Sequence, residues 1–342
     1  MSSGWSDLSI YESHDVVRDK YKDVHGGDIT AEKAAEIVAF FSQGRQYFEA
    51  AADGGPLVSP LLLYYGVNAL ARGAILFLNR QAQQCSLKPS HGIEIHGWQQ
   101  TLSGGIRNTA DLSLQIGTSG TFAELVQATG NRASVFITTE DFKYKFLEVR
   151  GTAQISAPVA VSLRDIMSRM PDLAELYADV IGEPSNVYNV GIRQSANGQQ
   201  TTIDVFGSHK FPPNDQDLRS RIPQLSSISA SQHVEPGDVR PAIRFTLHHP
   251  ASAPPDSLPP LRYVGGLTLL IPPFTTSLDL SPVAVSYLFA YALGMLARYF
   301  PRQWVALLAG GRGDRVYPLI REGLRKLQNT FPIDLAAELT RA

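Results

Sequence analysis

The chain contains very little cysteine, with Cys85 alone among its 342 residues. A single cysteine excludes an intrachain disulfide framework and a zinc site built from several thiolates, and it fits a reducing compartment. The N-terminal residues also lack a basic leader followed by an apolar stretch, which is the pattern of a secretory signal. The sequence therefore predicts a cytoplasmic protein.

Neither sign of charge is in excess, because 32 acidic residues face 30 basic ones. The overall field would not hold the protein on nucleic acid or on an anionic membrane, although a local basic patch is compatible with this balance. Apolar residues make up 44% of the chain, which is enough for a sizeable core. The length suits one large domain or two interdependent ones.

Signatures of catalysis and of metal binding are missing as well. We find no Walker loop, no dinucleotide-binding glycine fingerprint and no Gly-x-Ser-x-Gly elbow. His91, Glu94 and His96 lie close together, but the histidines are five residues apart and Gly92 and Gly97 interrupt a helix, so we expect no metal site. The sequence predicts no cofactor and favours a protein without catalytic activity.

Two long apolar runs, residues 59–78 and 281–300, stand out in the hydropathy pattern. A membrane-spanning helix needs about 20 mostly apolar residues, whereas Arg72 and Arg298 end each uncharged stretch earlier. Both runs begin with Ser-Pro, which is typical of a capped helix start. Because they are apolar on nearly all sides, we expect two helices buried in a protein core and no membrane partner.

The pattern between these runs changes from helical to β-rich. An amphipathic helix is expected after a Thr30 cap, and a second one over residues 161–182, split at Pro171. Residues 185–207 predict a hairpin around Asn197-Gly198, and further strands are expected at "SVFITT", "AIRFTLHH" and "YVGGLTLLIPP". The segment 208–260 is rich in proline and predicts mostly loop.

These elements predict an α+β fold with a helical body built from both ends of the chain. We expect an N-terminal helical segment over residues 1–120, a middle α+β segment over 121–280 that contains the Pro-rich loop 208–260, and a C-terminal helical segment over 281–342 that packs on the first.

A set of polar residues threads through the expected helical body. Arg72 and Arg298 could hold an anionic group such as a phosphate, and His91 could donate a proton or titrate. Tyrosine hydroxyls and an amide would orient the ligand. The alternative is a purely structural role, in which these groups form hydrogen bonds with one another in the core and bind no ligand. The full candidate set is Tyr64, Tyr65, Asn68, Arg72, His91, His96 and Arg298.

The stretch from Gly44 to Trp98 resembles the bacterial YaaC-like proteins. In that family a helix ending near Tyr-Phe precedes an apolar helix with a Tyr pair, and a His-Gly dipeptide follows, as in "GRQYF", "LYYGVNALARG" and "SHGIEIHGW" here. The resemblance returns over Ser281–Leu308, where Arg298, Tyr299 and Trp304 match the family's pattern. The family has no settled activity, so the resemblance implies an architecture more than a reaction.

The first helical pair is also similar to HEPN domains, which are helical modules of bacterial toxins, ribonucleases and nucleotide-binding partners. HEPN ribonucleases use an Arg and a His that lie close in sequence, so that the cation steadies the phosphate while the imidazole moves a proton. Arg72, at the position the resemblance indicates, has no His within six residues. This departure argues against nuclease activity.

We therefore hypothesise a YaaC-like binding or adaptor subunit of a bacterial protein complex, acting in antiphage defence, with a nucleotide or phosphate site between helices. It would bind a protein partner or itself, and a nucleotide or RNA. The alternative hypothesis is a HEPN-type ribonuclease or nucleotide-processing enzyme.

Overall fold

The computed structural model describes residues 3–83, 87, 90–139, 143–150, 154–207, 210–226, 228–233, 241–248, 260–275 and 278–341. The chain divides into two compact units. The first comprises Met1–Gly130, Ala153–Leu173 and Pro282–Ala342, and the second comprises Asn131–Thr152 and Ala174–Ser281. Helices at both ends of the chain and sheets in its middle confirm the predicted α+β class.

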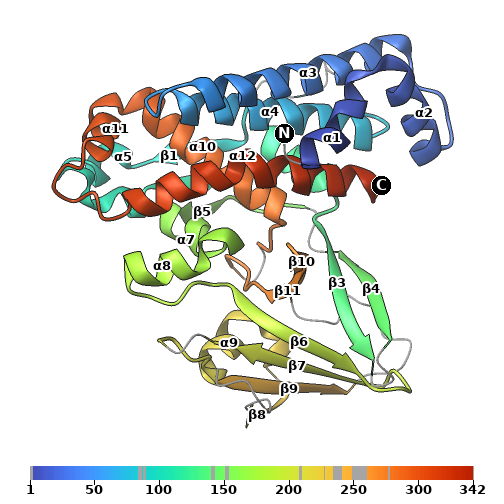
Figure 1. Cartoon of the computed structure of the whole chain (residues 1–342), viewed down its shortest axis with the longest axis vertical. Helices are drawn as coiled ribbons and strands as arrows, with labels where there is room; N and C mark the ends of the chain where they lie inside the picture. The colour runs from blue at the N-terminus through green and yellow to red at the C-terminus, as the bar shows by residue number, and fades with distance from the viewer. Residues whose placement is uncertain are drawn as a thin grey trace. The chain divides into compact units, whose positions relative to one another are not determined.

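The first unit is mainly helical and contains both ends of the chain (Figure 1). Its longest helices are α3 (Ala31–Asp53), α4 (Ser59–Leu78), α10 (Pro282–Tyr299) and α12 (Tyr317–Thr340). The shorter helical elements are α1 (Ser3–Ser9), η1 (Ile10–Glu12), α2 (His14–His25), α5 (Trp98–Thr101), η3 (Ile106–Asp111), α6 (Thr121–Ala128), α7 (Leu163–Ser168), η4 (Pro171–Leu173) and α11 (Pro301–Leu308).

Helix starts follow local rules that the sequence shows in part. The hydroxyl of Thr30 accepts a hydrogen bond from the backbone N–H of Lys33 and caps α3, as predicted. The expected Ser59 cap of α4 is wrong, because Val58 holds the N-cap position and Ser59 is already helical. Pro60 still occupies the first turn, where its missing N–H donor costs nothing.

Close packing of the long helices depends on glycines. A Cβ added at Gly66 of α4 would lie 2.5 Å from the ring of Phe48 on α3, and one at Gly73 would lie 2.9 Å from Phe41. These separations are below van der Waals contact, so only glycine lets the two helices approach this closely. α4 and α10 are buried along most of their length, as the apolar runs predict.

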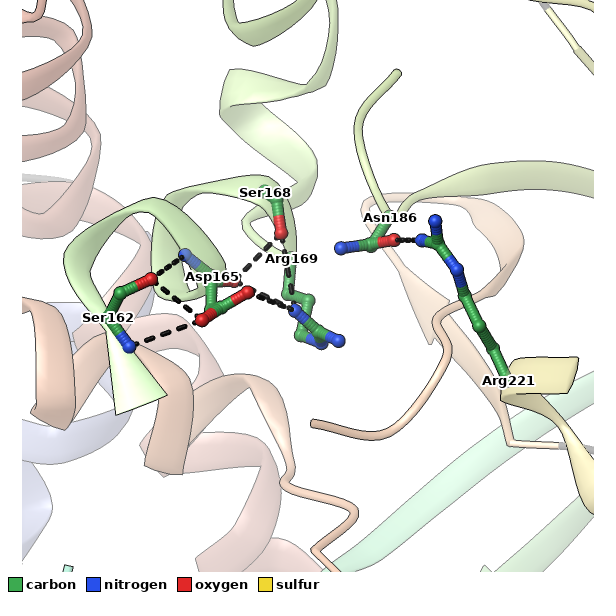
Figure 2. Close-up of polar contacts among 6 residues, drawn as sticks. All are labelled: Ser162, Asp165, Ser168, Arg169, Asn186 and Arg221. Carbon is green, nitrogen blue, oxygen red and sulfur yellow. Dashed lines mark hydrogen bonds and ion pairs between the residues drawn. The ribbon is translucent and has the colours of Figure 1, made fainter. Parts of the chain in front are cut away.

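A three-stranded antiparallel sheet of β1 (Ile93–His96), β2 (Ser113–Ile116) and β5 (Val159–Ser162) completes the first unit. α7 follows β5 directly and begins with a capping box, in which Ser162 and Asp165 bond each other's backbone N–H groups (Figure 2). The helix expected over 161–182 is split at Pro171, as predicted, into α7, η4 and α8.

The second unit is built on an eight-stranded sheet. Six strands follow the order β10-β11-β6-β7-β9-β8, and β3 pairs with both β6 and β4. Its elements are β3 (Arg132–Thr139), β4 (Tyr144–Arg150), α8 (Ala174–Ile181), β6 (Tyr188–Gln194), β7 (Gln200–Phe206), α9 (Asp215–Arg221), η5 (Pro223–Leu225), β8 (Ser229–His233), β9 (Ala242–His248), β10 (Leu261–Val264) and β11 (Leu267–Leu270).

The predicted hairpin is confirmed, because β6 and β7 pair antiparallel across the turn that contains Gly198, a residue with φ of 69°. The stretch "YVGGLTLLIPP" is two strands and not one. Gly265 and Gly266 both have positive φ and turn β10 back onto β11, which is the conformation that a tight hairpin requires.

The expectation of mostly loop between residues 208 and 260 is wrong for the described part of that segment. Besides β9, the strand predicted at "AIRFTLHH", it contains α9, η5 and β8, and Leu218, Ile222 and Leu225 are fully buried against the sheet. Asn214 caps α9, and Arg221 of this helix donates to the side chain of Asn186 (Figure 2). Apolar residues at helical spacing outweigh the proline content here. Residues 234–240 and 249–259 lie outside the described parts.

Within the described residues, α4 is the one helix long and apolar enough to cross a membrane, and α10 with α11 would pass the same test as a bent pair. In α4, 67% of the most apolar window is buried inside the structure. A buried core helix passes this test as readily as a membrane span does.

Candidate functional site

The candidate site lies where α4 crosses α10, two helices that are more than 200 residues apart in the sequence. A Cβ added at Gly294 of α10 would lie 2.8 Å from the Cβ of Tyr64 on α4. This glycine therefore lets the two helices touch at the tyrosine pair. The residues just before β1 supply His91 to the same place.

Aromatic rings form the buried floor of the site. Tyr64 is fully buried, and its ring centroid lies 5.4 Å from that of His91 and 5.3 Å from that of Tyr291. Tyr287 makes a third edge-on contact with Tyr64 at 6.2 Å. Edge-to-face packing at these separations is favourable and fixes the orientation of each ring.

Three hydroxyl groups of this floor are satisfied by protein partners. Tyr64 bonds Nδ1 of His91 at 2.5 Å, Tyr287 donates to the side-chain oxygen of Asn68 at 2.8 Å, and Tyr291 donates to the carbonyl of Ile93 at 2.7 Å. Burial raises the pKa of Tyr291 to about 12 and raises the pKa of Tyr64 and of Tyr287 further. All three are therefore neutral hydroxyls at physiological pH.

Burial sets the protonation state of His91. It lowers the pKa of this histidine, and the charges of Arg298 and Arg72 lower it further. The imidazole is therefore neutral at physiological pH. Its Nδ1 bonds the hydroxyl of Tyr64, with the donor set by the tautomer of the ring, and its Nε2 has no partner among the described residues.

The two guanidinium groups differ from the hydroxyls, because neither has a carboxylate partner among the described residues. Arg298 is exposed and donates to the hydroxyl of Tyr65 at 3.1 Å, and half-buried Arg72 lies 5.2 Å from the centre of the Phe40 ring. Arg45 of α3, by contrast, holds both carboxylate oxygens of Glu12 at 2.7 and 2.9 Å.

Six of the seven predicted residues thus belong to one site, and His96 does not. His96 is the exposed last residue of β1, and its side chain makes no hydrogen bond or ring contact within the described parts of the chain. His91 lies before β1 and contacts Tyr64 and Tyr291, none of which contacts His96 among the described residues, so a shared role for the two histidines has no geometric support. No group of three or more metal-ligating side chains occurs in the part of the chain that the structure describes.

Tyr287 and Tyr291 are the members of the site that the candidate set omits. Both are buried and bond candidate residues or the adjacent strand. The sequence carried a signal for them, since they repeat at helical spacing on the apolar run 281–300. Their partners, however, come from α4 and β1, and pairings across such a distance in sequence leave no local pattern.

A model of the family described as YaaC-like Protein matches residues 9–339 of the chain. No curated protein and no solved structure gives a significant match.

Proposed function

The chain belongs to the YaaC-like family, and from this premise we propose that it is a cytoplasmic, noncatalytic binding or adaptor subunit of a bacterial protein complex, acting in antiphage defence. Its site at the crossing of α4 and α10 recognises the phosphate group of a nucleotide. The defence role is supported by the resemblance of the first helices to HEPN modules, and the phosphate site is supported by the geometry below.

One observation carries the phosphate assignment, namely that two arginines act on the same histidine and neither has an ion-pair partner among the described residues. Arg72 and Arg298 both depress the pKa of His91, so the positive charge of both is felt at the imidazole. Nε2 of His91 adds a ring nitrogen without a partner in the described parts of the chain. Guanidinium groups that lack an acidic partner are suited to an anion, and they bind phosphate in a bidentate manner.

The neutral tyrosines belong to the structural part of the site. Their hydroxyls already have partners, so the core network and the anion site are two layers of one arrangement rather than alternatives. The buried layer, which consists of the tyrosine hydroxyls and their partners, orients His91. The exposed layer, which consists of the two arginines, supplies the charge.

Exposed apolar residues support the partner-binding part of the proposal. Leu57 and Val58, in the turn before α4, are each about half exposed, and Val305 of α11 is exposed as well. The indole N–H of Trp304 donates to the carbonyl of Pro56 at 3.2 Å, which holds α11 against this turn. The three side chains therefore lie on neighbouring segments, as expected of a surface that contacts another protein chain.

The enzyme hypothesis remains as the second candidate because His91 lies within the field of Arg72. The sequence spacing argued against a nuclease pair, but the fold brings an Arg and a His to one site from separate segments. A ribonuclease would cleave short RNA, and Arg72→Ala would abolish turnover while changing the melting temperature little.

Thermal melting with inorganic phosphate tests the anion site. Phosphate at about 100 times its Kd should stabilise the protein by roughly 2.7 kcal/mol, a rise in Tm of several degrees. Arg72→Gln should reduce this rise, whereas Arg18→Gln, which alters an exposed arginine on α2, should keep it. Sodium chloride at the same ionic strength controls for screening. A phosphate response as large in Arg72→Gln as in the wild type would contradict the proposal.

A further inference from the structure

The first unit contains a cavity of about 760 Å³ that holds none of the six clustered candidate residues. It is lined by α5 and the residues after it, by the end of α10, by α11, and by the loop that follows α11. A cavity of this volume lies in the range of small-molecule sites.

The cavity results from a sharp bend that the sequence encodes. α10 ends at Tyr299 and α11 starts at Pro301, and the two helices meet at 106°. Proline cannot continue the preceding helix, and it restricts the residue before it to non-helical backbone, as seen at Phe300 with ψ of 52°.

Two buried tryptophans hold the walls of the cavity. The indole N–H of Trp98 donates to the carbonyl of Ser113 at 2.6 Å, and its ring lies 5.7 Å from that of Phe300. Trp304 is equally buried and bonds Pro56. Such anchored walls make the cavity a preformed feature of the fold.

The charge of the lining is entirely positive. Arg302 and Arg312 are its only ionisable side chains apart from Tyr299, and neither makes an ion pair or hydrogen bond within the described residues. Gln99, Ser103 and Gln303 add neutral hydrogen-bonding groups. Two guanidinium groups without an ion-pair partner among the described residues are suited to a phosphate.

One of the two aromatic residues of the lining is well exposed. Tyr299 is 54% exposed, and the guanidinium of Arg298 lies 5.0 Å from the centre of its ring. An exposed ring beside cationic groups provides a stacking surface for a nucleobase, whose π face binds such platforms without regard to sequence.

We propose that this cavity is a second ligand site, which binds a phosphorylated nucleoside with its phosphate on Arg302 and Arg312 and its base against Tyr299. The ligand is either a free mononucleotide or the 5′ end of an RNA strand, since both present the same chemistry. The inference does not depend on phosphate binding beside His91, and the two places share only the contact between Arg298 and Tyr299 that the described residues show.

Calorimetric titration of the full chain with adenosine 5′-monophosphate, adenosine and a 5′-phosphorylated RNA tetranucleotide tests this site. Replacing Arg302 and Arg312 together with glutamine should weaken binding of the mononucleotide roughly a hundredfold, about tenfold for each charge-assisted contact. Tyr299→Ala should weaken it roughly tenfold and leave binding of inorganic phosphate unchanged. Arg321→Gln, an exposed arginine on α12, is the matched control and should bind as the wild type does.

The two nucleotide probes identify the source of the ligand. Tighter binding of the RNA with the same dependence on Arg302 and Arg312 assigns the cavity to an RNA end, and equal binding assigns it to a free nucleotide. Adenosine should not bind. The inference is overturned if the double replacement leaves binding of both phosphorylated probes unchanged, or if neither probe binds below about 10 mM. If Arg72→Gln abolishes binding and the replacement of Arg302 and Arg312 does not, the ligand binds beside His91, and the inference is overturned as well.

Discussion

Removal of one hydroxyl group at Tyr64 tests the distinction between the buried and exposed layers of the site. Tyr64→Phe keeps the ring and its aromatic contacts but removes the hydroxyl that lies 2.5 Å from Nδ1 of His91. This nitrogen is then left in a half-buried site without its partner, which costs about 1 to 3 kcal/mol. We expect the free energy of unfolding to fall by about 2 kcal/mol and Tm to fall by roughly 4 to 8 °C.

The neighbouring residue offers a matched control with the same chemistry. Tyr65 is half buried, and its hydroxyl accepts only from Arg298, whose guanidinium is exposed and can bond water instead. Tyr65→Phe should therefore change the free energy of unfolding by no more than about 0.5 kcal/mol. Urea unfolding followed by circular dichroism measures both variants. Equal losses in the two variants, or a loss confined to Tyr65→Phe, would refute the assignment of the layers.

Three further predictions concern other parts of the molecule. Gly294→Ala should destabilise the protein by a net 1 to 2 kcal/mol or so, because the clash with Tyr64 exceeds the gain in helix propensity, whereas Gly104→Ala, which meets nothing within 4 Å, should be neutral in the same urea assay. Arg244→Ala should lower the free energy of unfolding by about 2 kcal/mol or more, because it removes the hydrogen bonds of 2.6 and 2.7 Å to Asp204. Replacing both residues should lower it by less than the sum of the two single replacements, as a double-mutant cycle would show. Burial and the charges of Asp172 and Glu338 raise the pKa of Asp334 to about 7, so the folded state binds more protons than the unfolded chain between about pH 4 and 7. The free energy of unfolding should therefore fall by about 1 to 3 kcal/mol as pH rises over this range. Asp334→Asn should reduce that fall, as measured by unfolding curves at pH 5 and 8.

Local sequence patterns predicted much of the fold. Thr30 capped its helix, Pro171 split the predicted helix, and the Asn197-Gly198 turn joined two strands, because each of these effects acts within a few residues. The patterns failed where composition and packing disagree. In the segment 208–260, proline and serine suggested loop, yet Leu218 and its apolar neighbours at helical spacing form a helix against the sheet.

The sequence predicted most residues of the candidate site, but it did not predict how they are arranged. Arg72 and Arg298 were identified because charged groups in apolar runs must find partners or ligands. His91 was identified through the His-Gly dipeptide that resembles the pattern of the YaaC-like proteins. Their arrangement depends on the close crossing at Gly294, which no local pattern encodes. For the same reason His96 appeared equivalent to His91 in the sequence, although the strand directs it elsewhere.

The most direct test of the anion site is the protonation of His91, followed by nitrogen-resolved NMR of the imidazole, with His91→Gln to assign the signal. We expect the free protein to show a neutral imidazole with a pKa below the ordinary histidine value. Phosphate should raise this pKa, because a bound anion favours the imidazolium, and Arg72→Gln should reduce the response to phosphate. If phosphate leaves the titration of His91 where chloride at equal ionic strength leaves it, the two arginines do not form an anion site and the central claim is wrong.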